Sequence, residues 1–371
     1  MSKLGLYIHI PFCKSKCNYC DFISYADKHY ECFSYKNKLI KEIKKVVEKN
    51  SEIKSIFFGG GTPSIFPTDY IREILSALSY YKKTSNVEIT IEANPNTLDK
   101  DKLKDYLDMG INRLSVGLQS HDKNLLKILG RTHTFDDFER NIFCAKNIGF
   151  KNISADVMFS LPNQTLDIWK ETIEKLISFE LNHISAYSLI IEKNTPFGKL
   201  YDKNQLTLPD DKLDREMYYF LRERLLQANF RQYEFSNFAK VSHESVHNKI
   251  YWQRENYIGV GLGAHSFVDG VRYSNTTSLD DYLNLENVVV EEHKIDILEA
   301  MEEFVFLGLR MTQGIETAKF QKEFSKDVFD VFGGNLKSVI ELGYLKNEKG
   351  FLYLTNKGID VSNLVFSEIL T

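Results

Sequence analysis

The chain has 371 residues, of which 43% are hydrophobic and 13% aromatic, so it is long and apolar enough to form about two packed domains. Its 47 Lys and Arg residues are mixed with 51 Asp and Glu residues, which excludes the basic footprint of a nucleic-acid-binding protein. No apolar run approaches the ~20 residues of a membrane span, and no secretory leader pattern is visible, so we expect a cytoplasmic protein.

The first predicted element is a strand over residues 6–10, and it runs into a loop that carries three cysteines. These are Cys13, Cys17 and Cys20, in the spacing C-x3-C-x2-C. A cuboidal [4Fe-4S] cluster is normally held by four thiolates, so a loop that supplies three leaves one iron free to bind another ligand. The loop therefore favours a [4Fe-4S] cluster with an open iron.

Other chemistry for this loop has to be weighed. The three cysteines and His9 would also suit a Cys3His zinc site. His9 falls within the strand pattern, however, where its side chain is expected to pack into the interior rather than reach a metal. A disulfide is disfavoured because nothing indicates secretion. The remaining thiols, Cys32 and Cys144, fall in helical patterns and are expected to be buried or inert.

Strand and helix patterns then alternate as far as residue 227. The predicted strands cover residues 6–10, 55–58, 87–92, 113–118, 153–159 and 184–191, and the predicted helices cover 35–48, 69–81, 100–108, 135–147, 168–179 and 212–227. Six such units with apolar, β-branched strands predict an α/β fold with a parallel sheet, closed into an incomplete (β/α)6 barrel over residues 1–235. In such barrels the active site lies at the carboxyl ends of the strands.

Polar residues and glycines recur where these strands end. They are Gly60, Gly61 and Thr62 in GGGTPS, Glu92 in ITIEANP, Gln119 in GLQS, Arg131 in LGRTH and Asp156 in the fifth strand. The glycines let backbone N–H groups approach a ligand, although the loop is not a Walker phosphate loop because no Gly-Lys-Ser/Thr follows.

The two carboxylates need partners, because a buried charge costs several kcal/mol unless it is paired or hydrogen-bonded. One interpretation is that Glu92 and Asp156 pair with Arg113 or Arg131 inside the barrel. The other is that they bind a ligand. Their recurrence at strand ends favours the ligand.

Beyond residue 232 the repeat stops. Residues 236–294 are rich in aromatic residues and histidines and are expected to be irregular structure that covers the barrel mouth. Residues 295–371 combine helical patterns with a two-stranded wing and predict a smaller, mostly helical, winged-helix-like domain. Because this domain carries many acids and no basic recognition helix, we expect it to bind no nucleic acid and to pack against the barrel or a partner protein.

Together these motifs resemble the radical SAM family, whose proteins bind S-adenosylmethionine (SAM). The resemblance is carried by HIPFCKSKCNYCDF, GGGTPS, EANP, NRLSVGLQS, LGRTH and DVMFSLPNQT. It implies that the amino and carboxylate groups of SAM chelate the open iron. It also implies that the cofactor is lined by Tyr7, Tyr19, Gly60, Gly61, Thr62, Glu92, Gln119, Arg131 and Asp156.

Within that family the chain is similar to the haem chaperones, on the same motifs together with YEFSNFA and HNKIYW. This resemblance implies that the protein binds haem and passes it to acceptor proteins, some of them membrane-associated. It suggests His247 of HNKIYW as the axial ligand of the haem iron. The alternatives are that His247 is hydrogen-bonded within the covering segment, or that His265 in GAHSF is the ligand.

The oxygen-independent coproporphyrinogen III oxidases, which carry out a radical decarboxylation, are also similar. The cysteine loop of those oxidases resembles the pattern C-x3-C-x2-C-x-C, with a fourth cysteine two residues after the third. In this chain Phe22 stands at the position of that fourth cysteine. This departure favours the haem carrier over the oxidase. It leaves open whether SAM is cleaved in the function of this protein.

Overall fold

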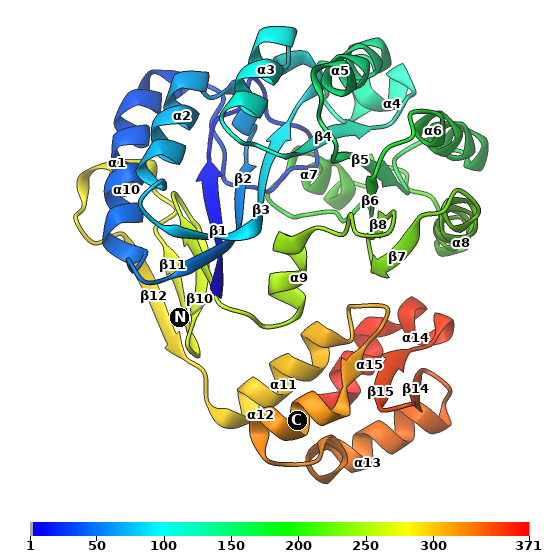
Figure 1. Cartoon of the computed structure of the whole chain (residues 1–371). Coiled ribbons are helices and arrows are strands. Elements are labelled where there is room, and N and C mark those ends of the chain that lie inside the picture. The colour runs from blue at the N-terminus through cyan, green and yellow to red at the C-terminus, as the bar shows by residue number, and fades with distance from the viewer. Residues whose placement is uncertain (1–2, 371) are drawn as a thin grey trace.

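The structure, a computed structural model, describes residues 3–370. Six parallel strands lie side by side in chain order and curve into an open barrel (Figure 1). They are β1 (Lys3–Ile10), β2 (Glu52–Gly60), β3 (Lys82–Ala93), β4 (Arg113–Gln119), β5 (Ile153–Phe159) and β6 (His183–Ser188). The predicted α/β class and incomplete (β/α)6 barrel are therefore confirmed.

Helices follow the strands along the chain, and most of them cover the outer face of the barrel (Figure 1). They are α1 (Cys32–Val46), α2 (Thr68–Ala77), α3 (Lys100–Asp108), α4 (Lys123–Ile128), α5 (Phe135–Ile148), α6 (Leu166–Ser178), α7 (Pro196–Asp202) and α8 (Asp211–Gln227). Every residue of β4 is buried, since one face meets helices and the other the barrel interior. The residues of β4 therefore alternate: Leu114, Val116 and Leu118 belong to the main hydrophobic core, whereas Ser115, Gly117 and Gln119 face the barrel interior.

Residues 236–294 are not the irregular cover that the sequence suggested. Most of the segment extends the sheet: β9 (Tyr257–Val260) pairs in parallel with β1, and three antiparallel strands follow it. These are β10 (His265–Val268), β11 (Val271–Asn275) and β12 (Val289–Lys294), with α10 (Leu279–Asn284) between the last two. At the other edge the order is β6, β8 (Asn237–Ala239), β7 (Arg231–Glu234). The expectation was wrong because these strands are short, and because β9, which joins them to the barrel, pairs with β1 near the start of the chain.

The HNKIYW motif forms α9 (Val246–Trp252), which lies between the barrel and the C-terminal domain (Figure 1). The carboxylate of Glu88 in β3 accepts hydrogen bonds from the backbone N–H groups of Val246 and His247, both at 3.1 Å. These contacts fix α9 at the amino ends of the parallel strands. The motif therefore closes the floor of the barrel and does not reach the mouth.

The C-terminal domain is helical with a small wing, as predicted. Its helices are α11 (Ile297–Gly308), α12 (Thr317–Phe324), α13 (Val328–Glu341), α14 (Asn356–Asp360) and α15 (Ser362–Ile369), and its antiparallel strands β13 (Ile315–Glu316), β15 (Phe351–Leu354) and β14 (Leu345–Glu348). It has a hydrophobic core of its own. None of the helices within residues 3–370 combines the length and apolar character needed to span a bilayer.

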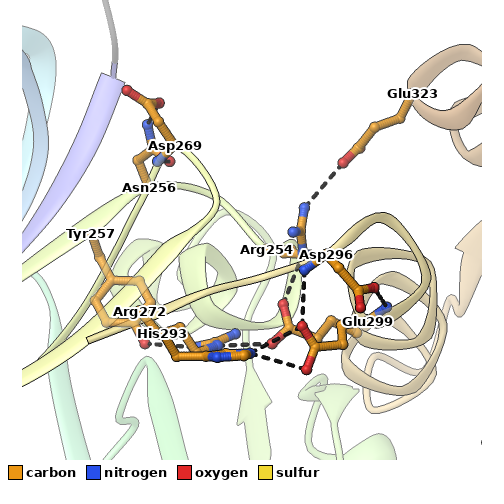
Figure 2. Close-up of polar contacts among 10 residues, drawn as sticks. Arg254, Asn256, Tyr257, Asp269, Arg272, His293, Asp296, Glu299 and Glu323 are labelled. Atoms are coloured by element: carbon orange, nitrogen blue, oxygen red, sulfur yellow. Dashed lines mark hydrogen bonds and ion pairs between the residues drawn. The ribbon is translucent and has the colours of Figure 1, made fainter. Parts of the chain in front are cut away.

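Ion pairs join this domain to the sheet. Glu303 of α11 accepts from Arg254 at 2.9 Å and from Arg272 at 2.8 Å, and Arg254 also reaches Glu323 of α12 at 3.2 Å. Figure 2 shows Arg254 between these two helices. Arg254 follows α9 in the left-handed conformation, with φ 53°, where glycine is the usual residue. An arginine here is strained, and its two ion pairs across the domain boundary offset that strain.

Candidate cluster and cofactor site

A cavity of ≈ 460 Å³ opens at the carboxyl ends of the parallel strands, beside the cysteine loop. Among the predicted site residues it is lined by Cys13, Cys17, Cys20, Tyr19, Gly60, Gly61, Thr62, Glu92, Gln119, Arg131 and Asp156. They meet here because parallel strands of one barrel end at the same rim. Of the predicted residues, Tyr7 and His247 lie outside the lining.

Backbone hydrogen bonds fix the cysteine loop from two sides. The N–H of Cys13 donates to the carbonyl of Tyr25 at 3.0 Å, and the N–H of Asn18 donates to the carbonyl of Leu129 at 2.9 Å. All three loop cysteines are free thiols, with Cys13 buried and the other two partly accessible. The loop thus presents three thiols to one cavity, while Cys32 and Cys144 lie on helices α1 and α5.

The donor set fits a cuboidal cluster. Within residues 3–370, no three His, Cys, Asp or Glu side chains are grouped closely enough to hold a single metal ion. Zinc would need that grouping, with ligands at about 2.0–2.3 Å, whereas each thiolate of a cuboidal cluster binds its own iron. His9 is also engaged elsewhere: its Nδ1 lies 3.0 Å from the Tyr7 hydroxyl and its Nε2 lies 2.9 Å from the Ile23 carbonyl oxygen. The geometry therefore favours a cluster over a Cys3His zinc site.

Glycine is required at the end of β2. Gly60 has φ 113°, and its N–H donates to the carboxylate of Glu92 at 3.3 Å. A Cβ on Gly61 would stand 2.9 Å from Cys13 Sγ and 2.8 Å from the carbonyl oxygen of Phe12. The first glycine is needed for its backbone conformation and the second for space. Together they bring bare backbone to the cavity wall.

Glu92 and Asp156 make the cavity receptive to a cation. The pKa of Glu92 is raised to about 8, first by burial and then by the Asp156 carboxylate, against the opposing effects of the Gly60 N–H and Arg113. Burial also raises the pKa of Asp156, which accepts from the Ser115 hydroxyl at 3.1 and 3.2 Å. A bound ammonium would relieve the repulsion between these carboxylates, which suits the amino group of an amino acid.

In the described part of the chain, Glu92 and Asp156 do not form the internal ion pairs with arginine that were the alternative to ligand binding. Across residues 3–370, no ion pair within 4.0 Å joins Glu92 or Asp156 to an arginine, and Arg113 acts on both carboxylates only through its longer-range field. Arg131 donates through Nη2 to the Gly117 carbonyl at 2.5 Å and through Nη1 to Cys17 Sγ at 3.7 Å. The carboxylates are therefore left for a ligand.

Tyr7 lies inside the barrel, outside the cavity lining. Its ring packs against Phe57 and His247, with ring centroids 6.1 and 6.3 Å apart. Its pKa is raised well above the ordinary value by burial and, next, by the charge of Glu92. The residue that the resemblance placed beside SAM thus stands within the field of Glu92 but does not line the cavity itself.

His247 lies at the opposite end of the barrel and is 1% exposed. Its Nδ1 bonds with the Ser55 hydroxyl and its Nε2 with the Tyr251 hydroxyl, both at 2.8 Å. This contradicts the predicted place of the motif at the barrel mouth, and it leaves neither ring nitrogen free for an iron. The ring of Trp252, in the same motif, packs against the Arg310 guanidinium, which lies 4.6 Å from the ring centroid. His265, by contrast, is exposed at the start of β10.

Several residues of the cavity were missed from sequence. They include Asn94, Ser115 and Met158. Ser115 could have been predicted from the sequence. Alternate residues of a strand point to the same face, so Ser115 lies on the same face as Gly117 and Gln119. Tyr187 and Ile190 also line the cavity. They fall at the carboxyl end of the predicted strand 184–191, where the active site of such a barrel is expected.

Known families match both parts of the chain. The Radical SAM superfamily matches residues 7–176, and the HemN C-terminal domain matches residues 295–361. A protein of Bacillus subtilis named heme chaperone HemW is 37% identical over 98% of both chains. The chain belongs to the HemW family of radical SAM proteins. This membership confirms the [4Fe-4S] cluster and SAM as the cofactors of the barrel.

Other relatives agree with this membership. The mitochondrial radical S-adenosyl methionine domain-containing protein 1 of Mus musculus is 33% identical over 97% of this chain and 84% of its own. Among solved structures, coproporphyrinogen III oxidase (HemN) from Escherichia coli superposes with a TM-score of 0.86 over 100% of this chain and 90% of its own, at 19% identity. That likeness shows that this chain shares the fold of the oxidase.

Proposed function

We propose that this protein is a haem chaperone, which binds haem beside a SAM-ligated [4Fe-4S] cluster and transfers the haem to acceptor proteins. The observation that carries the proposal is the match along the whole chain to proteins named heme chaperone HemW. We place the protein in the cytoplasm and include membrane-associated proteins among its acceptors. Its domains are the barrel core at 1–235, the segment 236–294 and the C-terminal domain at 295–371.

The cavity residues divide into three tasks. Cys13, Cys17 and Cys20 hold the cluster, which when bound supplies an iron with an open coordination position and accepts one electron. Gly60 and Glu92 receive the amino end of SAM, through the bare backbone and the carboxylate. The remaining lining residues orient the rest of SAM and exclude water: Tyr19, Thr62, Gln119, Arg131 and Asp156.

We propose His265 as the ligand of the haem iron. His265 is exposed, and it closely follows Gly263, where an added Cβ would stand 2.4 Å from Ile23 of the cysteine loop. It therefore lies on the same side of the barrel as the cluster. His247 has both ring nitrogens in hydrogen bonds and supports the fold.

A haem titration tests this assignment. Haem added to the purified protein should give a Soret band that His265→Ala shifts and weakens, while His247→Ala leaves its position unchanged. If the Soret band shifts only in the His247 variant, the haem ligand is His247 of HNKIYW and not His265.

The chaperone and the oxidase differ in one reaction. Anaerobic protein with a reconstituted cluster, incubated with coproporphyrinogen III, SAM and a reductant, should form no protoporphyrinogen, and the same preparation should bind haem. Conversion of the porphyrinogen without haem binding would replace the proposed function by that of a decarboxylase.

A further inference from the structure

Two thiols of the cysteine loop accept hydrogen bonds from side chains of the cavity wall. The hydroxyl of Thr62 donates to Cys13 Sγ at 3.5 Å, and Arg131 Nη1 donates to Cys17 Sγ at 3.7 Å. The two donors differ in kind, since only the one at Cys17 carries a full positive charge.

Arg131 is held in place by groups that do not neutralise it. Its Nη2 donates to the carbonyl of Gly117, and a Cβ at that glycine would stand 2.7 Å from Nη2, so the close approach depends on glycine. Its Nε is buried without an acceptor among the described residues. No Asp or Glu within residues 3–370 forms an ion pair with it at 4.0 Å or less. The sulfur of Cys17 is therefore the anionic group that its hydrogen bonds reach.

From this arrangement we infer that Arg131, assisted by Thr62, raises the reduction potential of the cluster. The inference rests on the proposed cluster and goes beyond it, because the resemblance assigned both residues only to SAM. Reduction adds one electron to the cluster, so negative charge on the cluster and its thiolates increases. A fixed positive charge and donors at the sulfurs stabilise that added charge more than the oxidised state.

The two donors should contribute unequally. The guanidinium carries a full charge, which stays protonated at any pH that the protein survives, whereas the hydroxyl of Thr62 carries only a dipole. Both act at the wall of a cavity, where water screens charge less than at the surface. We therefore expect Arg131 to have the larger effect on the potential.

The test is a potentiometric titration of the full-length, anaerobically reconstituted protein. Dithionite supplies the electrons, the reduced cluster is counted by electron paramagnetic resonance, and SAM is left out so that its binding cannot contribute. We expect Arg131→Gln to lower the midpoint potential clearly and Thr62→Val to lower it less. Arg72→Gln, which removes a surface arginine paired with Asp105, should leave it unchanged.

Iron and sulfide analyses separate the two levels of the proposal. If the wild-type protein assembles no cluster, the proposed cluster site itself is contradicted. A variant with full iron and sulfide content and the wild-type midpoint would overturn the inference for that donor. Should Arg131→Gln fail to hold iron, the titration of Thr62→Val decides, and an unchanged midpoint there rejects the tuning by hydrogen bonds.

Discussion

The imidazole of His247 and the hydroxyl of Ser55 lie 2.8 Å apart on the floor of the barrel, 192 positions apart in sequence. This bond ties α9 to β2, and α9 in turn carries Trp252 and is followed by Arg254, both of which contact the C-terminal domain. The motif that the family resemblance linked to haem thus joins the two domains in this structure.

We predict that His247→Ala destabilises the protein in a pH-dependent way. The loss of a buried hydrogen-bonding ring leaves Ser55 and Tyr251 unpaired, at roughly 1–3 kcal/mol for each unsatisfied group. The pKa of His247 is lowered to about 3, first by burial and then by Arg113, so the folded imidazole stays neutral. Its stabilising contribution is therefore present above pH 6.5 and is lost as the pH falls toward 3.

Thermal unfolding from pH 5 to pH 8 measures this effect. The gap in melting temperature between wild type and His247→Ala should narrow on acidification. His293→Ala, at an exposed histidine, should show little effect at any pH. A gap that stays constant with pH would mean that His247 is not held neutral.

A second prediction concerns the cluster ligands. Replacing Cys13, Cys17 or Cys20 by alanine should abolish the visible absorbance and the iron content of the reconstituted protein, because each thiolate holds a separate iron. Cys32→Ala and Cys144→Ala are the matched controls and should retain both. Loss of iron in either control, or zinc in place of iron in the native protein, would contradict the assignment.

Glu92→Gln should weaken SAM binding about tenfold to a hundredfold, since a hydrogen bond to a charged group contributes roughly 1.5–3 kcal/mol. Because the pKa of Glu92 is about 8, much of the carboxyl is protonated at pH 7. An incoming ammonium favours the ionised form, so binding should release a proton that the variant does not release.

Calorimetry in buffers of different ionisation enthalpy measures both the affinity for SAM and the number of protons released on binding. The iron content of the variant should equal that of the wild type. An unchanged affinity, or equal proton release by the two proteins, would show that Glu92 does not receive SAM.

Glu303→Gln should loosen the contact between the domains. Arg254 and Glu303 are 11% and 16% exposed, so removing the acid leaves the nearly buried Arg254 with only the more exposed Glu323 as an ion-pair partner. Arg272, at 35%, is more strongly screened by water. Breaking a buried pair costs roughly 3–5 kcal/mol, and we expect the lower end of that range. Urea unfolding measures the loss. Glu216→Gln, in the exposed pair with Lys212, should cost less than about 1 kcal/mol, and equal losses would contradict the role of Glu303.

The barrel and most of the site at its mouth could be predicted from sequence patterns alone. The alternation of strands and helices predicts a parallel sheet, and the parallel strands of a barrel end at one rim. Residues as far apart in sequence as Cys13 and Asp156 are therefore expected to lie close together there. The cysteine spacing is local, and it identified the cluster loop without any knowledge of the fold.

The end of the barrel that the later segments reach could not be predicted, because it depends on contacts between residues far apart in sequence. The place of α9 depends on Glu88 and Ser55, which precede it by more than 150 residues, and β9 finds its partner in β1 at the far end of the chain. The contact between Arg131 and Cys17 spans 114 positions. Periodicity and spacing report on neighbours in sequence. Contacts such as these are selected by shape and charge once the whole chain has packed, so the sequence pattern did not contain them.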